Sequence, residues 1–120
     1  MENLIIEATE YGPEIRLDAS GTISIHGKSM MEDASLYYSV CQNWVKEYLQ
    51  KNIGLITVEI DLSYFNSSSA KQLMKLLMTI DESETKGQVI WVYPKGNDVL
   101  LERGQELEIM LDLPFQYRAK

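Results

Sequence analysis

The chain has few of the residues that build disulfide-bonded, zinc-binding or nucleic-acid-binding proteins. Its 120 residues include one cysteine, Cys41, and one histidine, His26, so neither an internal disulfide nor a structural zinc site is expected. Eleven basic residues against eighteen acidic ones give a formal net charge of -7. Proteins that bind nucleic acids non-specifically gather positive charge to replace phosphate counterions, so a protein partner is the better expectation.

Membrane and export signals are also missing from the sequence. No apolar run approaches the ~18 residues that suggest a membrane span. The N-terminal residues also lack the pattern of a leader peptide, which is a basic region, then an apolar stretch, then a cleavage site of small residues. The unpaired Cys41 suits a reducing compartment and is expected to pack in the core. We therefore expect a cytoplasmic protein that does not insert into membranes.

The common catalytic and cofactor motifs are absent as well. The sequence has no Gly-x-Ser-x-Gly elbow, no Gly-x-x-x-x-Gly-Lys-Ser phosphate loop and no Gly-x-Gly-x-x-Gly turn. A nucleophilic serine would also need a base, and the one histidine lies far away in the sequence. These absences favour a protein that is not an enzyme and that carries no cofactor or metal.

What the sequence does contain is a regular alternation of strand and helix patterns. Its length and its 45% hydrophobic fraction predict one domain, residues 1–120, that buries about two-thirds of its unfolded surface. Strands are predicted at residues 4–8, 15–17, 23–25, 56–62, 89–93 and 115–118, and helices at residues 33–51, 70–80 and 100–111. The predicted fold class is α/β, with one mixed sheet and about three helices packed on one of its faces.

The first helix has the clearest amphipathic pattern. Ser29 or Asp33 could cap its start, and Asn52 with Gly54 could form its exit. Its predicted buried stripe comprises Leu36, Tyr37, Val40, Cys41, Trp44, Val45, Tyr48 and Leu49.

The strand at 56–62 ends in the sequence DLSYFNSSSAK, residues 61–71, where three consecutive serines precede a helix. One interpretation is that Asn66 or Ser67 caps the helix and the other serines fill its first turn. The other interpretation is functional, because free amides and the helix dipole at this position favour an added anion such as a phosphate. A phosphate would change the charge of one small surface patch without breaking the helix.

A competing hypothesis uses the polar side of the same strand. Thr57, Glu59 and Asp61 alternate with buried residues, and paired carboxylates can carry out acid and base chemistry. In this hypothesis the chain is a small enzyme that uses Glu59 and Asp61.

Residues 61–71 resemble the central motif of the SiaC family of bacterial regulatory phosphoproteins. The resemblance extends in the correct order from Gly27 to Phe115. It includes the segments 27–34, 44–49, 89–93 and 113–115 and the pair Glu102 and Gly104. Segment 27–34 is similar to the family's glycine-x-serine-x-proline-glutamate-asparagine stretch. Met30-Met31 stands in place of the usual aromatic-proline pair, and Pro94-Lys95-Gly96 in place of a more acidic turn.

The resemblance implies a partner-switching protein with a fold similar to that of STAS domains, the anti-sigma-factor antagonists. It implies that a Ser/Thr kinase with a histidine-kinase-like ATPase fold phosphorylates the residue after the motif asparagine, which is Ser67, with Ser68 as the rival. A PP2C-type phosphatase would remove the phosphate. The unphosphorylated form would bind and stimulate a diguanylate cyclase and so raise cyclic di-GMP.

The partner-binding surface expected from this resemblance comprises Tyr64, Asn66, Ser67, Ser68, Ser69 and Lys71. A third hypothesis is an anti-sigma-factor antagonist in the strict sense, which would act on transcription.

Overall fold

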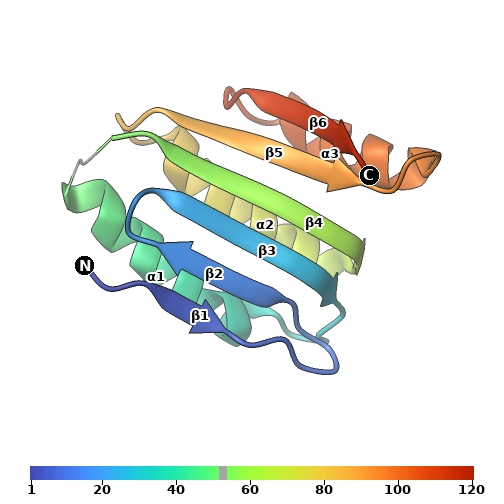
Figure 1. The fold of residues 1–120 in the computed structure, drawn as a ribbon, viewed down its shortest axis with the longest axis horizontal. Helices are drawn as coiled ribbons and strands as arrows, with labels where there is room; N and C mark the ends of the chain where they lie inside the picture. The colour runs from blue at the N-terminus through green and yellow to red at the C-terminus, as the bar shows by residue number, and fades with distance from the viewer. Residues whose placement is uncertain (52–53) are drawn as a thin grey trace.

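The computed structural model describes residues 1–51 and 54–120, which form one mixed sheet and three helices (Figure 1). The elements in chain order are β1 (Leu4–Ile6), β2 (Glu14–Asp18), β3 (Thr22–Ser29), α1 (Ser35–Lys51), β4 (Ile56–Phe65), α2 (Ser67–Asp81), β5 (Gly87–Tyr93), α3 (Asp98–Ile109) and β6 (Phe115–Ala119). Each predicted strand and helix is present, so the predicted fold class is confirmed. No helix in the described part of the chain is long and apolar enough to cross a membrane.

The six strands lie in the sheet in the same order as in the sequence. β1, β2 and β3 form an antiparallel meander, whereas β3, β4, β5 and β6 run parallel to one another. Each parallel connection needs a crossover, and α1, α2 and α3 supply the three crossovers. All three helices cover the same face of the sheet, as the sequence pattern predicts, and the other face is open (Figure 1).

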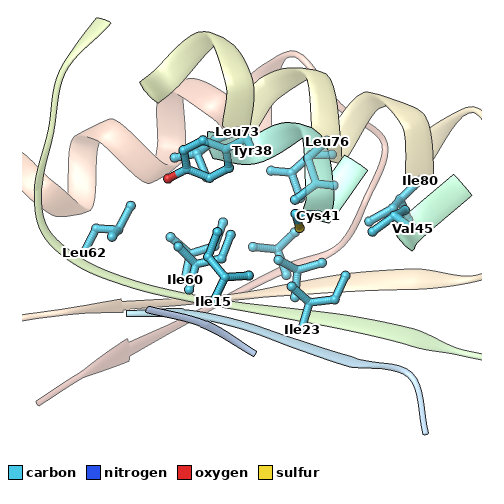
Figure 2. Close-up of a cluster of buried hydrophobic side chains, with 14 of the residues drawn as sticks. Ile15, Ile23, Tyr38, Cys41, Val45, Ile60, Leu62, Leu73, Leu76 and Ile80 are labelled. Atoms are coloured by element: carbon cyan, nitrogen blue, oxygen red, sulfur yellow. The ribbon is translucent and has the colours of Figure 1, made fainter. Parts of the chain in front are cut away.

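The core lies between the sheet and the helices. Alternate residues of β4, namely Ile56, Val58, Ile60 and Leu62, are buried beneath the helices. Leu73, Leu76 and Ile80 of α2 and Cys41 and Val45 of α1 pack above the sheet (Figure 2). Burial raises the pKa of the Cys41 thiol to about 12, so the thiol stays protonated and acts as a small apolar side chain, as expected.

The buried face of α1 differs in phase from the predicted stripe. Leu36 is 83% exposed and Val40 is 46% exposed, so the prediction that they are buried is wrong. Tyr38 and Gln42 are buried in their place. The Gln42 side chain donates a hydrogen bond to Thr79 Oγ1 at 2.6 Å, which lets this polar residue pack against α2. Partners on other elements set the rotation of this helix, and its own periodicity does not reveal them.

The ends of α1 test the predicted caps. The Asp33 carboxylate accepts hydrogen bonds from the backbone N and the Oγ of Ser35, at 3.0 and 2.7 Å, so Asp33 supports the chain just before the helix. The cap position itself belongs to Ala34, whose O accepts from Tyr38 N at 3.1 Å. Ser29 does not cap α1, because it is the buried last residue of β3. Asn52 lies outside the described residues, and Gly54 follows with a φ of 121°, in the region that favours glycine.

Helix α3 packs closely on β5 at a glycine, as the sequence suggests. A Cβ atom on Gly104 would lie 2.7 Å from the ring of Trp91. Trp91 is 1% exposed, and its Nε1 donates a hydrogen bond to Leu100 O at 2.9 Å. Phe65 packs edge-on against the same ring, with the ring centroids 5.8 Å apart, so the buried ring has little room to move away from α3.

We expect the substitution Gly104→Ala to destabilise the protein by up to about 2 kcal/mol. Alanine would gain ~1 kcal/mol of helix propensity, but overlap with a fixed, buried ring costs more, about 1–3 kcal/mol. The free energy of unfolding in urea measures the net effect. Gln105→Ala, at the exposed neighbouring position, is the control and should change stability little. A stabilised Gly104→Ala variant would show that α3 can slide away from β5.

Candidate functional site

Two segments that lie far apart in the sequence meet at one edge of the sheet. β3 and β4 are parallel, so their carboxyl ends lie together, and Ser29 is paired with Phe65. The chain then leaves β3 through residues 30–34, which we call the strap, and leaves β4 through Asn66 into α2. The backbone N of Asn66 donates to Ser29 O at 3.1 Å. Two of the segments that carry the family resemblance, 27–34 and 61–71, therefore form one site.

Asn66 connects the start of α2 to the strap. Its Oδ1 accepts a hydrogen bond from Ser69 N at 2.9 Å, so Asn66 is the N-cap of α2, one of the two predicted alternatives. Its Nδ2 donates to Met31 O at 2.9 Å. Both ends of the side-chain amide are thus used, one for the helix and one for the strap.

The three serines occupy different environments. Ser67 is the first helical residue and is exposed. Ser68 is half-buried, and its Oγ accepts a hydrogen bond from Ala34 N at 2.8 Å. Ser69 is fully buried. Of the three hydroxyls, the Ser67 hydroxyl is therefore the one presented to solvent, and it lies where the helix dipole favours negative charge.

The burial of Ser69 corrects one expectation. Its side chain has no exposed surface with which to touch a partner, and it serves instead as a buried support beneath the first turn of α2. Ser69 Oγ donates to Ser29 O at 2.9 Å and accepts from Ser29 Oγ at 2.6 Å.

A tyrosine of α1 extends this buried contact. Tyr38 is 3% exposed, and its hydroxyl lies 2.8 Å from Ser29 Oγ. Burial raises the pKa of Tyr38 to about 12, so the hydroxyl keeps its proton at neutral pH and can donate it. Sequence reasoning missed both Tyr38 and the role of Ser29, because their contact joins different elements.

Tyr64 and Lys71 border the serines. Tyr64, 51% exposed, precedes the buried Phe65 and so lies on the open face of the sheet. Lys71 is exposed on α2. The pKa of the Asp33 carboxyl lies below its usual value, mainly because of the hydrogen bonds from Ser35 and to a smaller extent because of the positive charge of Lys71. Lys71 is therefore close enough to the strap to act on Asp33.

A hollow lies between the strap and the loop before β2. It has a volume of about 350 Å³ and is lined by Tyr11, Met30, Met31, Glu32 and Asp33. Met30 N donates to Tyr11 O at 2.8 Å, which brings the loop before β2 next to the strap. No signal in the sequence identifies Tyr11 as part of this region.

The carboxylates of the competing enzyme hypothesis lie elsewhere, on the open face of the sheet. Glu59 is paired with Arg118 at 3.1 Å, and Asp61 with Lys120 at 2.8 Å. His26 Nε2 lies 3.7 Å from Asp61. Each carboxylate thus faces a basic side chain across the strands, as solvated ion pairs on a sheet face commonly do. Within residues 1–51 and 54–120, no group of three or more His, Cys, Asp or Glu side chains could hold a metal ion.

Comparison with known proteins agrees with the motifs. Residues 6–120 match the family described as "SiaC family regulatory phosphoprotein". The chain is 27% identical to an uncharacterized protein of Pseudomonas aeruginosa (strain UCBPP-PA14) over 123 residues, which cover 99% of this chain and 98% of that protein.

Solved structures also resemble the chain. SiaC of Pseudomonas aeruginosa superimposes with a TM-score of 0.90 and 26% identity, covering all of both chains. A crystal structure of the diguanylate cyclase SiaD in complex with its activator SiaC, also from Pseudomonas aeruginosa, matches with a TM-score of 0.92 and 26% identity over 98% of this chain and 99% of that chain.

The substitution Asn66→Ala should destabilise the protein by about 2 kcal/mol, because it removes a helix cap and also the hydrogen bond to Met31 O. Asn97 is a matched control, since it caps α3 through the same kind of bond, from Leu100 N to Oδ1 at 3.0 Å. Asn97→Ala should cost ~1 kcal/mol. Chemical denaturation measures both values. Equal losses would show that the bond between Asn66 and the strap contributes nothing to stability.

Proposed function

This chain belongs to the SiaC family of regulatory phosphoproteins, and from this premise we propose that it is a non-enzymatic partner-switching protein whose Ser67 is reversibly phosphorylated. The observation that carries the proposal is the exposure of Ser67 at the start of α2, beside two serines whose hydroxyls are engaged in hydrogen bonds. A kinase can reach Ser67 without unfolding the site. Ser68 is a poorer acceptor, because its phosphorylation would disrupt the contact with Ala34 N.

The switch needs one enzyme to add the phosphate and one to remove it. The family motif favours a Ser/Thr kinase with a histidine-kinase-like ATPase fold and a PP2C-type phosphatase, both acting in the cytoplasm. A phosphate on Ser67 would add about -1.5 to -2 charges to this surface. Because these charges would lie at the positive end of the α2 dipole, the helix would remain intact. The fold can therefore persist in both states while the surface changes.

A diguanylate cyclase is the proposed output partner. The solved relative that activates the diguanylate cyclase SiaD shares the fold of this chain over nearly its whole length. We place the docking surface around Tyr64, Asn66, Ser67, Ser68 and Lys71, with Ser69 as its buried support. Unphosphorylated Ser67 permits docking and raises cyclic di-GMP synthesis, and the phosphate blocks docking through its bulk and charge.

Mass spectrometry on the protein from its native cells tests the modification directly. The peptide containing residues 64–71 should carry one phosphate that a manganese-dependent phosphatase removes. Ser67→Ala should abolish this phosphate, whereas Ser68→Ala, the neighbouring control, should keep it. Phosphate that persists on Ser67→Ala and disappears from Ser68→Ala would assign the switch to Ser68.

Binding assays test the consequence of the modification. Ser67→Ala should bind the diguanylate cyclase constitutively, and phosphorylation of the wild type should weaken binding on the order of tenfold or more. Ser67→Asp should weaken it less, because aspartate carries one charge where the phosphate carries nearly two. Isothermal titration measures these affinities. Equal affinity of the phosphorylated and unphosphorylated forms would exclude a switch at this residue.

A further inference from the structure

Beneath the exposed Ser67 lies a chain of three buried hydroxyl groups. Ser29 and Ser69 are 0% exposed, and Tyr38 is 3% exposed. They come from three elements, β3, α2 and α1, and contact one another at 2.8 Å between Tyr38 and Ser29 and 2.6 Å between Ser29 and Ser69. The surrounding side chains, including Leu62 and Leu73, belong to the apolar core (Figure 2).

Counting protons fixes the direction of every bond in this chain. Ser69 Oγ donates its proton to Ser29 O, and Ser29 Oγ donates its proton to Ser69 Oγ. The Ser29 hydroxyl has no second proton, so the Tyr38 hydroxyl must be the donor in the contact between them. The chain therefore runs from Tyr38 to Ser29 to Ser69 and ends on a backbone carbonyl, with each proton used once.

Packing alone does not require these hydroxyls. Apolar side chains of similar shape could fill the same space, since replacing both partners of a hydrogen bond can leave stability nearly unchanged. Satisfied polar networks differ from apolar contacts in being directional, so they fix one arrangement of the elements that they join. Here that arrangement sets the height and rotation of the first turn of α2 against β3 and α1.

The residues on either side of Ser67 are consequently all fixed. Asn66 is held by Ser29 O and Met31 O, Ser68 by Ala34 N, and Ser69 by Ser29. We propose that Tyr38, Ser29 and Ser69 form a positioning relay that holds the first turn of α2 so that the Ser67 hydroxyl is presented in one orientation. This role for the relay rests on the proposed function, but its structural part can be tested without it.

Tyr38→Phe removes the first hydroxyl of the relay and leaves the ring in place. Its matched control is Tyr37→Phe on the same helix, which removes a hydroxyl that donates to Pro13 O at 2.7 Å, away from the serines. The readout is hydrogen exchange at Ser69 N and Ala70 N, the amides bonded to Asn66 Oδ1 and Asn66 O.

In Tyr38→Phe these two amides should exchange about three- to tenfold faster, which is the effect of losing one net hydrogen bond locally. Amides in the later turns of α2 should not follow. Tyr37→Phe should leave Ser69 N and Ala70 N unchanged. Ser29→Ala should give a larger local effect, and if that variant does not fold, Tyr38→Phe alone decides. Uniform acceleration across α2, or none at all, would overturn the positioning role.

The second readout is the initial rate of phosphate incorporation at Ser67 in an extract of the native cells. Tyr38→Phe should be phosphorylated about three- to tenfold more slowly than wild type, because the Ser67 hydroxyl is then no longer presented in one orientation, and Tyr37→Phe at the wild-type rate. An unchanged rate in Tyr38→Phe, with the local exchange raised, would overturn the link to Ser67. If wild-type protein takes up no phosphate, the proposed function fails, while the exchange data still decide whether the relay positions the turn.

Discussion

The parallel pairing of β3 with β4 is the constraint on which the rest of the site depends. It places the carboxyl ends of both strands at one edge, so that Ser29 and Phe65 are neighbours although they are far apart in the sequence. Asn66 then bonds to both Ser29 O and Met31 O, and the start of α2 becomes part of the same unit as the strap. A slip in this pairing would remove the bond from Asn66 to the strap, the relay and the support of Ser68 together.

Around this junction, three adjacent serines take three different roles because each points into a different environment. The direction of α2 turns Ser69 into the core, Ser68 toward the start of α1 and Ser67 toward solvent. This arrangement separates the hydroxyls that hold the turn from the hydroxyl that the proposed switch would modify. The buried and half-buried hydroxyls hold the turn, so the exposed one is free to be modified without loss of the fold.

The two faces of the sheet also differ in what they carry. The covered face carries the core and ends at the serine site, whereas the open face carries ion pairs such as Glu59 with Arg118 and Asp61 with Lys120. The family membership and the shared fold with an activator of a diguanylate cyclase are consistent with a regulatory role. The proposed switch needs a stable scaffold and one patch whose charge can change, and the exposed Ser67 at the start of α2 would be that patch.

The sequence by itself determined the order of the elements, the fold class, the buried face of β4 and the location of the serine motif. These features follow from local signals: period-two and period-3.6 apolar spacing, turn residues and capping residues. It did not determine the rotation of α1, where Leu36 and Val40 are exposed and Tyr38 and Gln42 are buried, because partners on β3 and α2 fix that rotation. The difference between the three serines likewise came only from the tertiary structure. Adjacent residues of one type have the same local signal, and only the surrounding elements decide which hydroxyl is buried and which reaches solvent.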